Sequence, residues 1–185
     1  MRASAPGQSV LLLLEAVAVL KDGEVDYAVI GAIAASVHAI VRASADADAV
    51  LSVSRQQLEE LEGKFNTSGF ETELTRGDEQ DPIPAMLKLR DRYENRVDLL
   101  AGLRGLEFAA FARAIDVPFM GEVLRVIGRE DFIAMKVFAG GPQDLIDAGR
   151  VIAMAPETLD MPLLRRVTQR YGQAATEALE RILKR

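Results

Sequence analysis

The chain has 185 residues but no cysteine, no tryptophan and a single histidine, His38. Without cysteine it forms neither disulfides nor thiolate metal sites, which is typical of a protein in a reducing compartment. One histidine cannot build a multi-histidine zinc site, and a Ser-His-Asp hydrolase would depend on His38 alone. Because His38 lies in an apolar segment, a hydrogen-bonded structural histidine is the favoured interpretation, and a catalytic one is the alternative.

Long apolar runs are also missing. No stretch reaches the ~18 residues that span a bilayer. The N-terminal run "SVLLLLEAVAVLKDG" briefly looks like a secretion signal, but Glu15 interrupts it and no clear small-x-small cleavage site follows. We therefore expect an amphipathic helix there, and a soluble, cytoplasmic protein without a membrane partner.

The charge is moderate and uneven. A net charge of −6 argues against a surface that generally coats nucleic acid. Residues 161–185 differ from the rest, with six basic and two acidic side chains. Two interpretations stay open for this segment. It is a solvated helical face with basic residues near helix C-termini, or it is where a phosphate-rich or acidic partner docks.

Hydrophobic periodicity predicts the elements of an α/β (or α+β) domain. Period-two or buried apolar runs indicate strands at 26–31, 47–53, 70–75, 85–91 and 95–101, and two more within 115–128. Helical periodicity indicates helices at 8–21, 32–41, 54–63 and 105–114, and several more from 129 to the end. This order predicts a mixed β-sheet core flanked by helices, residues 1–127, and a helical C-terminal part, residues 128–185, packed on it.

The stretch "RASADADAVLSV" places two carboxylates at the start of a strand. Asp46 and Asp48 stand at i and i+2, so in a strand they point to the same face. Like charges this close repel and raise each other's pKa, and a divalent cation between them removes that cost. Oxygen ligands without histidine or cysteine favour Mg²⁺ or Mn²⁺. The alternative is that the pair serves a turn or a helix cap.

A third carboxylate, Asp98 in "NRVDLLA", lies within an apolar strand. A lone charge there is costly unless it is paired or bound to a metal. If this strand lies beside the first, three carboxylates converge, a set that can hold two metals for in-line displacement at a phosphoryl group. The alternative is a salt bridge from Asp98 to Arg96 or Arg42.

The stretch "YAVIGAIAAS" predicts a strand, a turn at Gly31 and a helix. Glycine lets a ligand approach the backbone closely, and a helix N-terminus offers N–H groups and partial positive charge to phosphates. The turn stands one helix before the Asp-x-Asp pair. A phosphate cradle and a metal site could therefore lie side by side, although such a turn is also commonly structural.

Together these segments resemble the nucleotidyltransferase superfamily with the DNA polymerase β-type fold. Its motif is a strand, a Gly-Gly or Gly-Ser turn, a helix, Asp-x-Asp on the next strand and a later aspartate on another strand. Within that superfamily the chain is similar to the AbiEii-like and minimal nucleotidyltransferases of bacterial toxin-antitoxin systems. Arg42 and Ser44 match a basic residue and a hydroxyl residue before the Asp-x-Asp. Lys136 with Asp144 and Asp147 matches a later helical block.

The resemblance implies a Mg²⁺-dependent enzyme that moves a nucleoside monophosphate from an NTP to a hydroxyl of a protein or RNA acceptor. It implies that Asp46 and Asp48 bind metal and that Asp98 is both a metal ligand and the general base. The residues implied in nucleotide binding are Gly31, Ala32, Arg42, Ser44 and Lys136. The implied partners are an NTP and an acceptor such as a cognate toxin, an antitoxin or a tRNA.

The chain also departs from the motif. Ala32 stands where glycine or serine is common, and Gln143 stands where a basic residue is common. Lys136 could equally be a solvated helix lysine, and the two aspartates of the helical block could stabilise a helix N-terminus. The alternative function is therefore a catalytically degenerate protein of this fold that acts as an antitoxin or protein-binding module.

Overall fold

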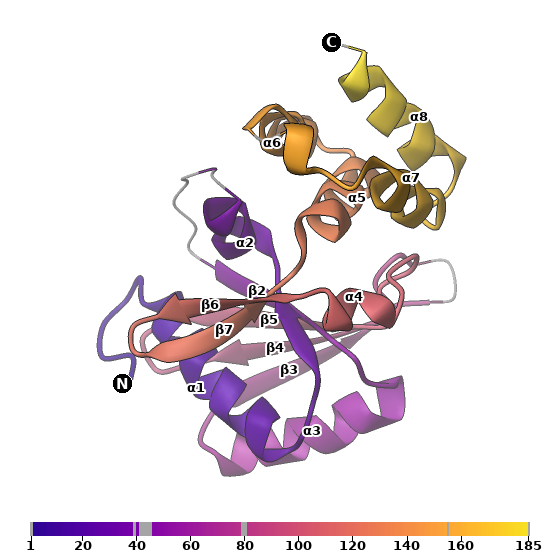
Figure 1. The fold of residues 1–185 in the computed structure, drawn as a ribbon. Helices are drawn as coiled ribbons and strands as arrows, with labels where there is room; N and C mark the ends of the chain where they lie inside the picture. Colours follow the sequence, from indigo (N-terminus) through magenta and orange to yellow (C-terminus); the bar gives the residue numbers. More distant parts are fainter. Residues whose placement is uncertain (1, 39, 41–45, 79–80, 155, 185) are drawn as a thin grey trace.

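The computed structural model describes residues 2–38, 40, 46–78, 81–154 and 156–184. Among these residues, seven strands form one mixed sheet in the order β3-β4-β5-β2-β1-β7-β6 (Figure 1). The strands are β1 (Tyr27–Val29), β2 (Asp46–Leu51), β3 (Glu71–Arg76), β4 (Ala85–Arg90), β5 (Arg96–Ala101), β6 (Ile115–Phe119) and β7 (Glu122–Val126). The predicted α/β class with a mixed sheet is confirmed.

Helices α1 (Ser9–Asp22) and α3 (Arg55–Thr67) pack on one face of the sheet. The predicted N-cap of α3 is present as a capping box: Ser54 Oγ accepts from the Gln57 N–H at 3.3 Å, and Gln57 Oε1 accepts from the Ser54 N–H at 2.8 Å. The helix then buries the side chains of Leu58, Leu61 and Phe65 and runs past the predicted end at Gly63.

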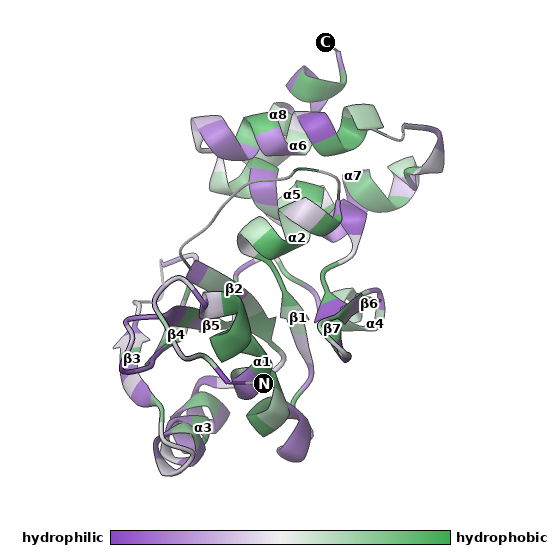
Figure 2. Ribbon diagram, turned by 90° about the vertical axis from the view of Figure 1, so that its left-hand side faces the viewer, coloured by the Kyte–Doolittle hydropathy of each residue, from purple (hydrophilic) through white to green (hydrophobic). Residues whose placement is uncertain are grey.

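Strand alternation gives the sheet one apolar and one charged face. In β4 and β5 the side chains of Leu87, Leu89 and Leu99 are fully buried. Lys88 lies between Leu87 and Leu89, and Asp98 directly precedes Leu99. Both side chains are half-buried and point to the other face. The apolar face is the one covered by α1 and α3, and Figure 2 shows hydrophobic residues concentrated in β1 and β2 at the middle of the sheet.

The C-terminal helices lie on the opposite side of the sheet from α1 and α3 (Figures 1 and 2). They are α5 (Arg129–Ala139), α6 (Pro142–Met154), α7 (Met161–Gln169) and α8 (Gln173–Leu183), with the short turn η1 (Pro156–Thr158) between α6 and α7. Of the helices in the described ranges, none is both long enough and apolar enough to cross a membrane.

The predicted helix over residues 105–114 is wrong in length, because only α4 (Ala109–Ala112) is helical there. Gly105 has a φ of +90°, outside the right-handed helical region, and Tyr171 of the C-terminal part packs directly on its Cα. A side chain at residue 105 would overlap the Tyr171 ring. The chain therefore bends at Gly105, where the C-terminal part packs against it.

The predicted helix over 32–41 is also shorter in the structure, where it is α2 (Gly31–Val37).

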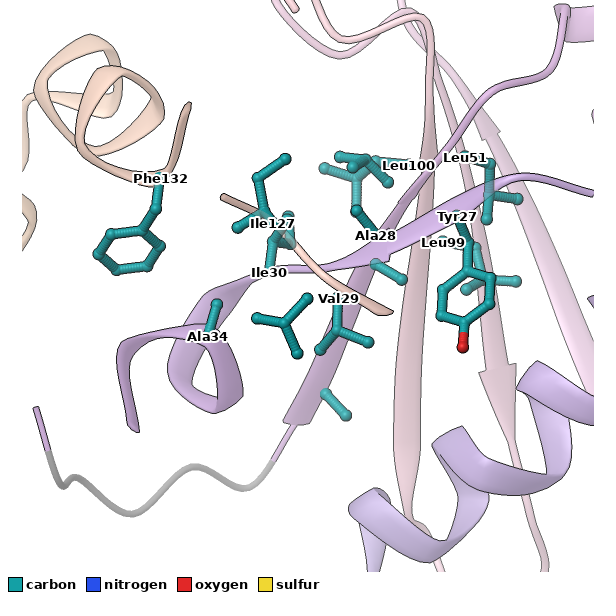
Figure 3. Close-up of a cluster of buried hydrophobic side chains, with 14 of the residues drawn as sticks. Tyr27, Ala28, Val29, Ile30, Ala34, Leu51, Leu99, Leu100, Ile127 and Phe132 are labelled. Atoms are coloured by element: carbon teal, nitrogen blue, oxygen red, sulfur yellow. The ribbon is translucent and has the colours of Figure 1, made fainter. Parts of the chain in front are cut away.

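An apolar contact joins the sheet to the C-terminal helices. Phe132 of α5 reaches toward Ile127 and Ala34, beside the buried cluster around β1 (Figure 3). The His38 ring lies 5.3 Å from the Phe132 ring, and its Nε2 donates a hydrogen bond to the Ile127 carbonyl at 2.9 Å. His38 therefore has the structural role that its apolar segment suggested.

We expect His38 to make stability fall in mild acid. Burial lowers the pKa of His38 below its usual value of 6.5, so below that pH the unfolded chain binds a proton that the folded chain does not. The free energy of unfolding should then decrease as the pH falls from 6.5 toward the lowered value. Denaturation at pH 7.5 and 5.5 should show a smaller loss in His38→Gln, whose amide keeps a donor without titrating. An equal loss in both proteins would contradict this account.

A second joint between the two parts is ionic. Arg113, just after α4, donates Nε and Nη2 to the two carboxylate oxygens of Asp131 on α5, each at 2.8 Å. Its Nη2 also lies 2.8 Å from Glu107 Oε1, and Glu107 in turn pairs with Arg166 of α7 at 3.0 Å. Asp131 is 3% exposed, so this pair is largely removed from water.

Three of the basic residues of the C-terminal segment, although exposed, contact other residues of the same chain. Arg166 pairs with Glu107, Arg165 pairs with Glu180 at 2.9 Å, and Arg170 donates to the Gly105 carbonyl at 3.0 Å. These contacts favour the structural interpretation of the basic segment over partner docking.

Candidate active site

The three aspartates singled out by the sequence share one face of the sheet. Strands β2 and β5 pair in parallel, with Asp48 opposite Asp98 and Asp46 opposite Arg96. Residues in register on neighbouring strands point to the same face, with Cα atoms about 4.8 Å apart. The condition set in the sequence analysis, that the strand of Asp98 lies beside the Asp46–Asp48 strand, is met. This face is not the one on which α1 and α3 pack.

The environment of Asp98 disfavours its negative charge. Burial raises the pKa of Asp98, and the nearby charge of Asp46 raises it further. Three cations oppose this effect: Lys88, Arg96 and Arg90. Asp98 is thus a carboxylate with a raised proton affinity, which suits either a proton acceptor or a ligand whose charge a cation would neutralise.

The donor chemistry of this face fits a hard divalent cation. The aspartates of β2 and β5 offer carboxylate oxygens, the ligands that Mg²⁺ and Mn²⁺ prefer. Within the described ranges, no group of three or more acidic or histidine side chains is arranged so that it could hold a metal ion. Asp48 and Asp98 are direct neighbours across β2 and β5, so these two carboxylates are the ones that would share a cation.

Gly31 is tied to this face by a close approach that the sequence did not assign. It opens α2 with a φ of +63°, and its Cα lies against the Asp48 carboxylate, so that a Cβ at residue 31 would overlap Oδ2. The neighbouring Ile30 N–H donates to the Asp48 carbonyl at 2.9 Å. The sequence predicted a ligand at this glycine. In the structure, the group that comes closest is the carboxylate of a candidate metal ligand.

Gly31→Ala should therefore displace Asp48 and destabilise the protein. A non-glycine residue at positive φ costs about 1–3 kcal/mol, and the new methyl group also pushes on Oδ2. Gly63→Ala is the matched control: Gly63 lies inside α3 with open space around it, so this change should stabilise by about 0.5–1 kcal/mol. Denaturant unfolding measures both, and equal effects at the two sites would contradict the proposed contact.

Lys136 is engaged within the C-terminal helices. Its Nζ lies 2.6 Å from Asp144 Oδ1 and 3.5 Å from Asp147 Oδ2, both on α6. Gln143 Nε2 donates to the other oxygen of Asp147 at 2.7 Å. The residues of the helical block thus contact one another, and the triphosphate role predicted for Lys136 stays a prediction.

Of the other predicted nucleotide-binding residues, one lies in the described part of the chain and two do not. Ala32 follows Gly31 in the first turn of α2 and is buried, with 4% of its surface exposed. Arg42 and Ser44 lie outside the described residues.

The sequence analysis missed two basic residues on the same face, Lys88 and Arg90, and named Arg96 only as the alternative salt-bridge partner of Asp98. Across β4 and β5, Lys88 stands opposite Asp98, and Arg90 stands opposite Arg96. Lys88 donates to Glu73 of β3 at 2.9 Å, and this bond lowers the pKa of Glu73. The alternation in "AMLKLR" signals such a polar row, but only the register places it beside Asp98.

Comparison with known proteins identifies the fold. No family model matches the sequence, and no curated protein matches it. Among solved structures, an antigenic nucleotidyltransferase-like protein from Paracoccidioides brasiliensis aligns at a TM-score of 0.61 with 16% identity, covering 98% of this chain and 90% of its own. The fold is therefore that of nucleotidyltransferase-like proteins, as the sequence resemblance implied.

An antibiotic-resistance factor and an antibiotic adenylyltransferase share this fold. The antibiotic-resistance factor ANT(2'')-Ia aligns at a TM-score of 0.59 with 13% identity, covering 97% of this chain and 96% of its own. A lincosamide antibiotic adenylyltransferase with lincomycin bound aligns at 0.51 with 13% identity, covering 82% and 99%. At these identities the likeness extends to the fold, and the AbiEii-like subfamily remains a prediction.

Proposed function

We propose that this protein is a Mg²⁺-dependent nucleotidyltransferase, which moves a nucleoside monophosphate from an NTP to an acceptor hydroxyl. The observation that carries the proposal is the register of β2 and β5, which places Asp46, Asp48 and Asp98 on one face of the sheet. The nucleotidyltransferase-like fold supports it, because the same fold occurs in proteins named for nucleotide transfer.

In this reaction the acceptor oxygen forms a bond to the α-phosphorus while the bond to pyrophosphate breaks. The proton of the acceptor hydroxyl passes to the Asp98 carboxylate. The raised pKa of Asp98 suits this role, because a base works best when its pKa lies closer to the working pH.

The remaining residues would hold the substrate. Asp46, Asp48 and Asp98 would bind the cation, which when present neutralises phosphate charge and polarises the reacting phosphoryl group. The backbone of the turn at Gly31 and Ala32 would contact the triphosphate. Asp48, resting on the Gly31 backbone, would link the phosphate contact to the metal ligands.

The acceptor proposed from the sequence is a hydroxyl of a protein or RNA, within a toxin-antitoxin or related system. A cognate toxin, an antitoxin or a tRNA would be the partner. The structural neighbours add small molecules to the acceptors worth testing, because ANT(2'')-Ia has been captured with adenylyl-2''-tobramycin.

The alternative is a catalytically degenerate protein of this fold that binds a partner as an antitoxin or protein-binding module. The observation that favours it is the pairing of Lys136 with Asp144 and Asp147. This pairing neutralises within the protein the positive charge that was expected to contact the triphosphate. Ala32 in place of glycine or serine points the same way.

Calorimetric titration with ATP, CTP, GTP and UTP, with and without Mg²⁺, separates the two functions. We expect Mg²⁺-dependent binding of at least one NTP, lost in the double variant Asp46→Asn/Asp48→Asn. Asp116→Asn, which changes an exposed carboxylate of β6, is the control and should bind normally. Absence of binding to all four NTPs would favour the degenerate alternative.

A further inference from the structure

The C-terminal helices carry a groove that the candidate active site does not use. It has a volume of about 760 Å³ and is lined by residues of α6, η1, α7 and α8. Among the described residues, none that lines it belongs to the sheet or to α5. In both ribbon views α5 lies between the sheet and the layer of α6 and α8 (Figures 1 and 2). A ligand in this groove would therefore be separate from a nucleotide at β2 and β5.

One side of α6 lines the groove along almost its whole length. The lining residues of this helix stand three or four apart: Pro142, Leu145, Ile146, Gly149, Ile152 and Ala153. This spacing places them on one face of the helix, and an apolar stripe of this kind normally packs on another element. Ile146 is 48% exposed, so the stripe is only partly covered within the chain.

Helix α8 forms the second wall of the groove, through Ala178, Ile182 and Leu183. It meets α6 at Gly149, where a Cβ atom would stand 3.6 Å from Ile182 Cγ2. The lining of α6 spans residues 142–153, which is about 16 Å at the rise of an α-helix, or three turns. Two apolar helix faces of this length can receive a third helix between them.

Two arginines add positive charge to the apolar groove, Arg150 from α6 and Arg181 from α8. Both are exposed, and within the described part of the chain neither has an ion-pair partner. They differ in this from Arg165, Arg166 and Arg170, which contact other residues of the chain. Charge without a partner thus stands where the apolar helix faces are open.

The acids nearest in sequence on the same two helices are engaged elsewhere. On α6, the buried Asp147 lies 3.5 Å from Lys136 Nζ and accepts from Gln143 at 2.7 Å. On α8, Glu177 accepts from Gln173 at 2.8 Å. The charges of the two groove arginines are therefore available to an acidic partner.

We propose that this groove binds an amphipathic helix of a partner protein, whose apolar side lies on α6 and α8 and whose acidic side chains pair with Arg150 and Arg181. The inference does not depend on the proposed function. Apolar residues three and four apart on the partner would fill the groove. Acidic residues beside them would select the partner and fix its direction. A second copy of this chain fits less well, because a two-fold contact here would place the arginines of both copies in one interface.

The test begins with a phage-displayed library of randomised helical peptides about four turns long, selected against the whole protein. We expect enriched peptides to share an apolar stripe with aspartate or glutamate beside it. Fluorescence anisotropy with one enriched peptide then gives its affinity. Ile146→Glu should weaken binding by more than about 10-fold, because it buries a charge against the apolar side of the peptide. Ile115→Glu on β6, where the isoleucine is 43% exposed, is the matched control and should bind normally.

Reversal of charge tests the two arginines. The double variant Arg150→Glu/Arg181→Glu should bind the acidic peptide less tightly by about 10-fold or more. It should bind a version of the peptide with lysine in place of each acidic residue more tightly than the unchanged protein does. Arg55→Glu, which changes an exposed arginine of α3, should alter neither affinity. All these variants replace exposed side chains, so thermal unfolding should show that they fold normally.

Three results would overturn the inference. One is a selection that yields no peptide, or peptides that bind Ile146→Glu as tightly as the unchanged protein. Another is a preference for basic over acidic peptides. The third is a dimer in sedimentation that Ile146→Glu converts to a monomer, because the groove would then be filled by a second copy. Absence of NTP binding would remove the proposed function and leave this inference standing.

Discussion

Replacing Asp98 with asparagine should lower the rate of nucleotide transfer by about 10²- to 10⁴-fold, the usual contribution of a general base. Asparagine keeps the shape of the side chain but accepts no proton from the acceptor hydroxyl. The change should not unfold the protein. Burial and the charge of Asp46 raise the pKa of Asp98 above its unfolded value, so ionised Asp98 destabilises the folded state near neutral pH, and a neutral amide removes that cost.

Two measurements distinguish this result from a damaged fold. Single-turnover transfer gives the rate, and denaturant unfolding at pH 7 gives the free energy, which should be equal to or higher than that of the unchanged protein. Asp116→Asn, the same substitution on β6, should alter neither quantity. Transfer at an undiminished rate in Asp98→Asn would remove Asp98 from the role of base.

Replacing Arg113 with methionine should destabilise the protein by about 3 kcal/mol, the lower end of the cost of breaking a buried ion pair. The substitution leaves the carboxylate of Asp131, which is 3% exposed, without its two hydrogen bonds from Arg113. Methionine retains the apolar stem, so most of the loss should come from the stranded charge. Because Arg113 joins the strand-bearing part to α5, we also expect the C-terminal helices to be digested first by protease.

The matched control for this prediction is Arg165→Met. Arg165 pairs with Glu180 at 2.9 Å, but both side chains are exposed, and surface pairs contribute little to stability. Chemical denaturation of both variants gives the comparison. Equal stability of Arg113→Met and Arg165→Met would show that the buried joint does not hold the two parts together.

The elements that the sequence predicted well are those with strong local signals. The strand of Asp46 and Asp48, the capped helix after Ser54 and the helix after Gly128 have clear periodicity and end signals, and each appears in the structure. The cost of an isolated charge in an apolar strand singled out Asp98, and the register of β2 and β5 then places it beside Asp48. The local sequence signals were thus sufficient to single out the three aspartates of the candidate site.

The features that the sequence did not predict depend on contacts between distant segments. The helix expected over 105–114 is interrupted at Gly105 because Tyr171 packs there, far along the chain. The approach of Asp48 to Gly31 and the opposition of Arg90 and Arg96 both depend on strand register. Register cannot be read from alternation within one strand, because alternation defines only which face a side chain occupies.

The central claim is that one face of the sheet, at β2 and β5, binds a divalent cation with the triphosphate of an NTP. Its most direct test is a crystal structure of the protein with Mn²⁺ and a non-hydrolysable analogue of the NTP that binds in calorimetry, located by anomalous scattering. The account predicts an anomalous peak coordinated by Asp46 and Asp48, with the triphosphate reaching the turn at Gly31. A peak elsewhere, or a nucleotide bound away from this face, would contradict it.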